Sequence, residues 1–109
     1  MIKNENGVFL SGYENAEARC GKWWAIIKYG QNDKGMWIKA TAVDGIARGY
    51  SYPLSEESYQ YDTKKDCIEA AWLEIRRFLE KKGGADSEEI RKLGQKLKVT
   101  KEVTQPDLF

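Results

Sequence analysis

The chain has 109 residues, a length that suits one domain with a short tail. Its 18 basic and 17 acidic residues give a formal net charge of +1, which excludes a histone-like nucleic-acid binder and an acidic mimic of DNA. Aromatic residues make up 12% of the chain and predict a folded body rather than a disordered one. Because basic and acidic residues nearly balance, any electrostatic patch must come from an uneven distribution of charges.

The composition also sets expectations about location and metals. The N-terminal residues are polar, and no stretch reaches the length of a membrane span. We therefore expect a soluble, cytoplasmic protein with no membrane partner. Cys20 and Cys67 do not have the spacing of a metal site, and the chain has no histidine, so we expect two reduced thiols, no metal and no cofactor.

The first thirty residues contain one clear strand. Residues 1–6 are expected to be a frayed start, and residues 7–13 predict a short strand between glycines. Residues 14–19 are polar and fit either a loop or a single turn of helix. Residues 22–29 alternate and predict a strand with one buried face. That face, the expected core side, carries Trp23, Ala25, Ile27 and Tyr29.

The next segments predict an antiparallel meander. Residues 30–35 are rich in Gly, Asn and Asp, which is typical of a turn, and residues 36–43 predict the following strand. Asp44-Gly45 is typical of a tight hairpin. Residues 46–52 predict a third strand, which Pro53 ends or places at an edge of the sheet.

Two helices follow the strands. Thr63 is a good N-cap, and Asp66 forms a capping-box-like pair with it. An apolar stripe on the first helix consists of Ile68, Ala71, Trp72, Ile75, Phe78 and Leu79. Gly83-Gly84 is expected to stop this helix. A second helix after Asp86-Ser87 carries a narrow seam of Ile90, Leu93 and Leu97, and Gly94 weakens it by roughly 1 kcal/mol relative to alanine.

The order of these elements predicts an α+β fold. We expect an antiparallel meander sheet of three or four strands, one long helix packed on it and a shorter C-terminal helix. Residues 1–97 form this single domain, residues 98–104 a linker without periodicity, and residues 105–109 a separate peptide motif. We recognise no family resemblance for residues 1–97.

Signatures of catalysis are missing from the sequence. The chain has no histidine, no serine or cysteine in a recognisable nucleophile setting, and no glycine-rich loop that ends in Lys-Ser or Lys-Thr. The adjacent pairs Glu56-Glu57 and Glu88-Glu89 do not converge on one site, because neighbours in a helix or strand point apart. We therefore expect a protein that is not an enzyme.

Aromatic and basic residues alternate on the expected outer face of the sheet. They are Lys22, Trp24 and Lys28 on the first strand, Trp37 and Lys39 on the second, and Arg48 and Tyr50 on the third. Tyr52 shares the face of Arg48 and Tyr50. Such a surface stacks the bases and neutralises the phosphates of single-stranded DNA, at about 1–3 kcal/mol per stacked base. The alternative is that the aromatic residues fill a small core flanked by solubilising lysines, or that residues 1–13 cover this face.

The last five residues, Gln105-Pro-Asp-Leu-Phe109, follow a polar, charged run. They resemble the pentapeptide with which bacterial DNA polymerases and repair proteins dock on the sliding clamp. The resemblance implies that the clamp is the partner and that Gln105, Asp107, Leu108 and Phe109 contact it. Pro106 stands where the family most often has Leu, which lowers the expected affinity. The alternative is a latch, in which Leu108 and Phe109 fold back onto the helices.

These observations support two main hypotheses of function. The first is a small, non-enzymatic accessory protein of DNA replication or repair, encoded by a phage or mobile element and tethered to the bacterial sliding clamp by its tail. The second is a phage-type inhibitor that blocks the clamp or a host defence enzyme without binding nucleic acid. A third is an enzyme subunit whose active site needs a partner chain to complete it.

Overall fold

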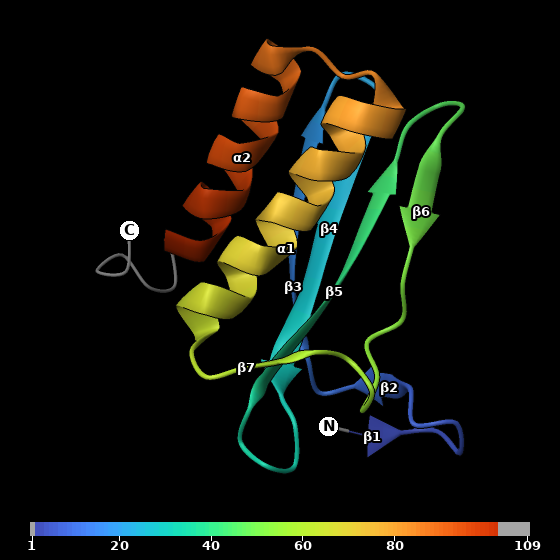
Figure 1. Cartoon of the computed structure of the whole chain (residues 1–109), viewed down its shortest axis with the longest axis vertical. Helices are drawn as coiled ribbons and strands as arrows, with labels where there is room; N and C mark the ends of the chain where they lie inside the picture. The colour runs from blue at the N-terminus through green and yellow to red at the C-terminus, as the bar shows by residue number, and fades with distance from the viewer. Residues whose placement is uncertain (1, 103–109) are drawn as a thin grey trace.

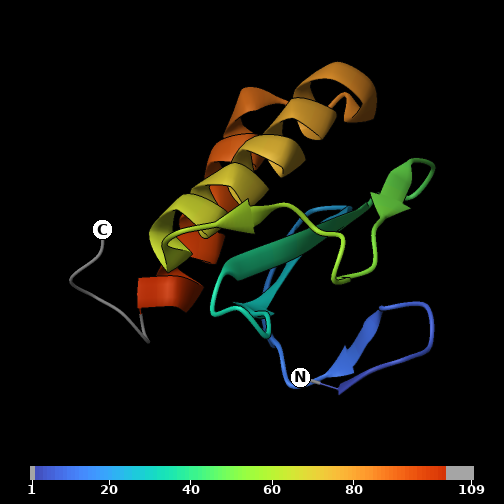
Figure 2. The same cartoon turned by 60° about the horizontal axis from the view of Figure 1, so that its bottom comes forward.

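The alternating first half of the chain folds into strands, and the second half, with its spacing of three and four, folds into helices. A computed structural model describes residues 2–102, and the side chains of residues 2–97. Helices α1 (Lys64–Phe78) and α2 (Ser87–Glu102) lie side by side on one face of an antiparallel sheet (Figures 1 and 2). The structure confirms the predicted α+β class with a meander sheet followed by helices.

The main sheet has the strand order of a meander. Its neighbours in order are β3 (Glu14–Cys20), β4 (Trp23–Gln31), β5 (Trp37–Asp44) and β6 (Gly49–Ser51), and β7 (Gln60–Tyr61) also pairs with β5. Strand β3 occupies a segment that the sequence left open between loop and helical turn. Ala16 and Ala18 lie opposite Ile27 and Ala25 of β4 and are buried with them.

The N-terminal residues form a second, smaller sheet. Strand β1 (Ile2–Lys3) pairs with β2 (Phe9–Ser11), so the expectation of a frayed start is wrong for the paired residues of β1. Figure 2 shows these two strands on the side of the main sheet away from the helices. Phe9 packs there in a separate core with Ile38, Ala40 and Leu54. One part of the outer face of the main sheet is therefore covered.

The main core lies between the sheet and the two helices. The face of β4 predicted to be buried is buried, with Trp23, Ala25, Ile27 and Tyr29 at most 5% exposed. The helices contribute Ile68, Ala71, Ile75, Leu79, Leu93 and Leu97, while Trp72, Phe78 and Ile90 are only partly buried. Burial of each large apolar side chain stabilises the fold by about 1.5–3 kcal/mol, and Cys67 is buried in this layer too.

Local signals set the limits of the helices. The Oγ1 atom of Thr63 accepts a hydrogen bond from the backbone N–H of Asp66 at 3.1 Å, which confirms the predicted cap. α1 continues as a π-helical turn, Leu79–Gly83, and the chain leaves it through Gly84 at φ 74°. Helix α2 extends to Glu102, so it includes residues 98–102 of the expected linker. No helix within residues 2–102 is long and apolar enough to cross a membrane.

Helix α2 depends on a close approach at Gly94. A Cβ atom added to Gly94 would lie 2.8 Å from Cζ2 of Trp72 on α1. On a free helix surface, Gly94→Ala would stabilise the protein by roughly 0.5–1 kcal/mol. We expect Gly94→Ala to destabilise it by about 1–2 kcal/mol instead, because the methyl group overpacks the contact between the helices. Urea denaturation of both proteins measures the difference.

The neighbouring residue supplies the control for this prediction. Gln95 is exposed on α2, so Gln95→Ala is expected to change the free energy of unfolding by no more than about 0.5 kcal/mol. A stabilised Gly94→Ala protein would show that the two helices do not approach each other at this point.

Candidate functional site

The seven residues predicted to contact nucleic acid do not share one face of the sheet. In the β4–β5 pairing, Trp24 lies opposite Asp44 and Lys28 opposite Ala40, while Trp37 lies opposite Gln31 and Lys39 opposite Tyr29. Because Tyr29 is part of the main core, Trp37 and Lys39 point to the helix side, and Trp24 and Lys28 point away from it. The expectation of one open face is therefore wrong.

The ring of Trp24 on the outer face of the sheet already contacts neighbouring side chains. The guanidinium carbon of Arg19 lies 4.1 Å from the ring centroid of Trp24, and Nε1 of Trp24 donates a hydrogen bond to Glu17 at 3.2 Å. Lys22 does not take part in these contacts around Trp24. Its Nζ atom lies 5.1 Å from the ring of Trp23, which belongs to the main core. These contacts leave the outer face less suited to stacking bases than the sequence suggested.

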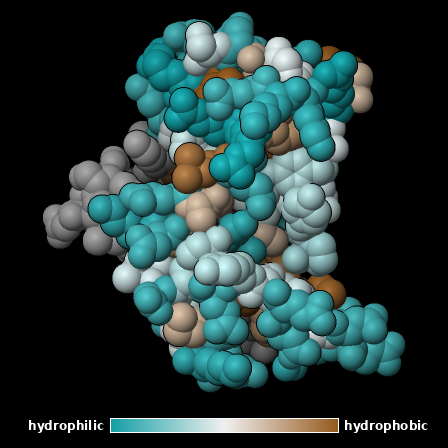
Figure 3. Space-filling model, viewed as in Figure 1, coloured by the Kyte–Doolittle hydropathy of each residue, from teal (hydrophilic) through white to brown (hydrophobic). Residues whose placement is uncertain are grey.

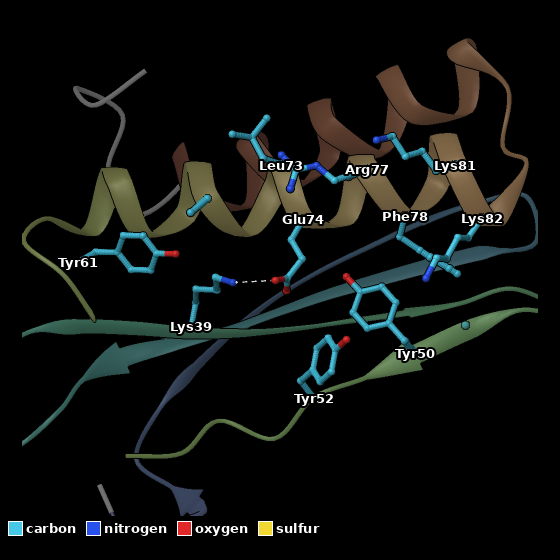
Figure 4. Close-up of a pocket in the computed structure, with 12 residues that line it drawn as sticks. Lys39, Tyr50, Tyr52, Tyr61, Leu73, Glu74, Arg77, Phe78, Lys81 and Lys82 are labelled. Atoms are coloured by element: carbon cyan, nitrogen blue, oxygen red, sulfur yellow. Dashed lines mark hydrogen bonds and ion pairs between the residues drawn. The ribbon is translucent and has the colours of Figure 1, made fainter. Parts of the chain in front are cut away.

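Three of the predicted residues meet on the helix side. Lys39, Arg48 and Tyr50 lie in or beside a cleft between α1 and strands β5 and β6, with a volume of about 680 Å³. We call it the α1–β6 cleft. Its aromatic lining consists of Tyr50, Tyr52, Tyr61 and Phe78, and its charged lining of Lys39, Glu74, Arg77, Lys81 and Lys82 (Figure 4). Figure 3 shows pale residues of intermediate hydropathy on this face, next to teal hydrophilic ones.

Strand β6 and α1 build the aromatic side of the cleft. Tyr50 meets Phe78 edge to face, with ring centroids 5.0 Å apart, and lies 5.2 Å from the ring of Tyr52. The Tyr50 hydroxyl shares a 2.8 Å hydrogen bond with Oγ1 of Thr41. Burial of this ring raises the pKa of Tyr50 to about 12. Tyr52 is 56% exposed at the edge of the cleft, so its ring is accessible to a ligand.

The only carboxylate among the described lining residues is already engaged. Nζ of Lys39 donates to Oε2 of Glu74 at 3.1 Å, and the Thr41 hydroxyl donates to the other carboxylate oxygen. Because Thr41 donates to Glu74, the Tyr50 hydroxyl is the donor in its contact with Thr41. Tyr50, Thr41 and Glu74 therefore form a short hydrogen-bonded chain at the back of the cleft.

The rim of the cleft carries positive charge without matching carboxylates. Arg77, Lys81 and Lys82 make no ion pair within 4.0 Å with any residue whose side chain the structure describes. Arg48 lies at the same end, since its Nη1 atom donates a 2.5 Å hydrogen bond to the carbonyl oxygen of Lys82. Against a net charge of +1 for the whole chain, the cleft concentrates positive charge and is suited to an anion.

Most of this cleft cannot be recognised as one site from the sequence. Arg77 and Lys81 are four residues apart, a spacing that places both on one face of a helix, but the sequence does not show that this face meets β6. Tyr52, which the two-residue spacing places on one strand face with Tyr50, also lines the cleft. Trp37, predicted to contact nucleic acid on the outer face, instead packs against the main core, with Nζ of Lys64 5.7 Å from its ring.

Other types of site find little support. Within the described residues, no three His, Cys, Asp or Glu side chains group as they would around a metal ion. The predicted clamp-binding residues Gln105, Asp107, Leu108 and Phe109 lie outside the residues that the structure describes. Comparisons of the chain with protein-family models, curated proteins and solved structures find no match.

Proposed function

We propose that this chain is a small, non-enzymatic accessory protein of DNA replication or repair that binds a bacterial sliding clamp through residues 105–109. The observation that carries the proposal is the string Gln-Pro-Asp-Leu-Phe in the sequence. It has the polar residue, the acidic residue and the two apolar residues of the clamp-binding pentapeptide in the same order. In this proposal the tail localises the binding surface of the body next to DNA.

Each residue of the motif has a physical role in this proposal. Leu108 and Phe109 enter an apolar pocket of the clamp, and their burial drives the association. The amide of Gln105 donates and accepts hydrogen bonds beside that pocket. Asp107 accepts hydrogen bonds from backbone N–H groups, and Pro106 restricts the unbound peptide. A peptide of this size gives an affinity in the micromolar range, about −8 kcal/mol.

The test of this proposal is clamp binding by the full chain and by Leu108→Ala/Phe109→Ala. We expect the double variant to bind a purified bacterial clamp at least about tenfold more weakly, which corresponds to about 1.4 kcal/mol or more. Isothermal titration calorimetry measures both dissociation constants. Val103→Ala/Thr104→Ala is the matched control, because it changes two residues immediately before the motif and is expected to bind like the unchanged protein.

Two outcomes would overturn the clamp assignment. Equal binding by the unchanged protein and by Leu108→Ala/Phe109→Ala would show that the motif is not used. Absence of binding by the unchanged protein would remove the partner. A lower Tm for the double variant, without any clamp binding by the unchanged protein, would support the latch, in which Leu108 and Phe109 pack on the body.

The near balance of charge, 18 basic and 17 acidic residues, favours a second candidate function. It is a phage-type inhibitor that occupies the peptide pocket of the clamp or blocks a host defence enzyme, with no nucleic acid involved. This candidate predicts that the protein displaces other clamp-binding peptides and binds no oligonucleotide at low salt. Salt-sensitive oligonucleotide binding would exclude it.

A further inference from the structure

We propose that the α1–β6 cleft binds single-stranded nucleic acid, with bases against Tyr52 and the neighbouring rings and phosphates along Arg77, Lys81 and Lys82. The inference deepens the proposed function, because it names the ligand of the body, and it rests on that function only for its biological setting. It also moves the expected site from the outer face of the sheet to the helix side.

The arrangement of charges favours a strand with a regular phosphate backbone. Arg77 lies in the last turn of α1, and Lys81 lies in the π-helical turn that continues it, about 6 Å further along the helix axis. Lys82 and Arg48 continue the positive charge at the end of that turn. Figure 4 shows Arg77 and Lys81 projecting from the side of α1 that faces away from the sheet. Successive phosphates of an extended strand can therefore follow the rim, each near a cation that has no competing carboxylate within 4.0 Å among the described residues.

The aromatic side of the cleft favours unpaired bases over other anions. Tyr52 offers an exposed ring, and Tyr50 behind it is fixed by Phe78 and by the hydrogen bond to Thr41. Bases that stack on such rings gain about 1–3 kcal/mol each. A duplex cannot use this surface, since its bases are already stacked inside the helix. The cleft volume of about 680 Å³ is that of a small-molecule site and suits a few splayed bases.

The pair of Lys39 and Glu74 sets the orientation of the strand in the cleft. The Glu74 carboxylate at the back neutralises Lys39, so the rim cations Arg77, Lys81 and Lys82 remain as the phosphate path. A carboxylate beside the rings can accept a hydrogen bond from a base N–H group. Bases therefore point inward and phosphates outward, which is the arrangement of sequence-tolerant single-strand sites.

The experiment is fluorescence anisotropy of a labelled oligothymidylate of about twelve nucleotides, titrated with the full chain at several salt concentrations. We expect Tyr52→Ala to weaken binding by roughly 5- to 150-fold, the equivalent of one stacked base, with an unchanged dependence on salt. We expect Arg77→Ala/Lys81→Ala/Lys82→Ala to weaken binding at low salt and to reduce the slope of log K against log salt by about two, since each phosphate that is no longer neutralised lowers the slope by about 0.7.

Matched controls separate this site from non-specific attraction. Lys65→Ala/Arg76→Ala/Lys92→Ala removes three charges outside the cleft lining, and Tyr59→Ala removes a ring that is 74% exposed and also outside it. Both are expected to bind within about twofold of the unchanged protein. Circular dichroism and Tm establish that every variant is folded.

Three results would overturn the inference. The first is no salt-sensitive binding by the unchanged protein. The second is equal weakening by the cleft triple variant and the control triple variant. The third is unchanged oligonucleotide affinity in Tyr52→Ala together with tight binding of polyglutamate, which would indicate an acidic protein partner. Leu108→Ala/Phe109→Ala is expected to retain oligonucleotide binding, so failure of the clamp proposal and failure of this one give different patterns.

Discussion

Replacement of Trp23 by alanine is expected to lower the free energy of unfolding by about 3–5 kcal/mol. The ring is 1% exposed and lies in the main core between sheet and helices. The backbone fits it closely, because a Cβ atom on Gly45 would lie 2.5 Å from Cζ3 of the ring, and one on Gly83 would lie 2.9 Å from Cη2. These backbone segments cannot easily collapse into the space, so the loss is expected near the upper end of the range.

Urea denaturation, followed by far-UV circular dichroism, measures this loss. A domain of this size has a total stability of about 5–15 kcal/mol, so Trp23→Ala removes a large part of it. Trp24→Ala is the matched control, since Trp24 is the next residue, has the same side chain and points to the partly exposed outer face. Its expected cost is about 1 kcal/mol, from the contacts with Arg19 and Glu17. Equal losses for the two variants would contradict the assigned face of β4.

Strand β4 could be predicted because its pattern is strong and its local preferences agree with its burial. Tryptophan, isoleucine and tyrosine favour strands, and their alternation identifies the buried face without knowledge of a neighbour. Strand β3 has the same two-residue period, but its buried positions Ala16 and Ala18 are alanines. Alanine is depleted in strands and gives little hydrophobic contrast. Only the pairing with β4 makes this segment a strand.

The face on which Trp37 and Lys39 lie could not be predicted, because it depends on the length of the turn before β5 to within one residue. Asn32 fixes the turn, since its Oδ1 atom accepts hydrogen bonds from the backbone N–H groups of Lys34 and Met36. Gly35, at φ 79°, completes it. This turn sets Gln31 opposite Trp37. A turn one residue longer or shorter would have moved every side chain of β5 to the other face.

The α1–β6 cleft combines residues that are far apart in the sequence. Lys39 comes from β5, Tyr50 from β6 and Glu74 from α1, and each is unremarkable in its own segment. A helix with exposed basic residues is usually a solvated surface. Here the ring of Phe78 docks on Tyr50 and brings Arg77 and Lys81 to the rim of the same cleft. The charge pattern becomes a site only when the tertiary contact between α1 and β6 is known.

Two tyrosines, the buried Tyr29 and the partly buried Tyr50, are expected to make the protein sensitive to alkaline pH. Burial raises the pKa of Tyr29 to about 12, with a further increase from the nearby carboxylate of Glu14, and burial raises the pKa of Tyr50 to about 12. In the unfolded chain both phenols ionise near pH 10. The unfolded state therefore loses protons between pH 10 and 12 while the folded state keeps them.

The sign of the effect follows from this difference. The stability that comes from keeping these phenols neutral is fully present below about pH 10 and is lost as the pH rises through about 12. One pKa unit corresponds to about 1.4 kcal/mol, and partial solvent screening reduces the contribution of each tyrosine to roughly 1–2 kcal/mol. We expect a loss of about 2–4 kcal/mol for the two together, measured by urea denaturation at about pH 9 and about pH 12.

The variant Tyr29→Phe/Tyr50→Phe isolates the contribution of these two groups. Groups other than these two tyrosines are present in both proteins, so their effects on stability cancel in the comparison. The double variant is expected to lose about 2–4 kcal/mol less than the unchanged protein between the two pH values, while Tyr59→Phe, at a position 74% exposed, keeps the full loss. Parallel pH dependence in the unchanged protein and the double variant would show that Tyr29 and Tyr50 are not protected from ionisation. The ring of Tyr50 would then be more accessible to water than its contacts with Phe78 and Thr41 indicate.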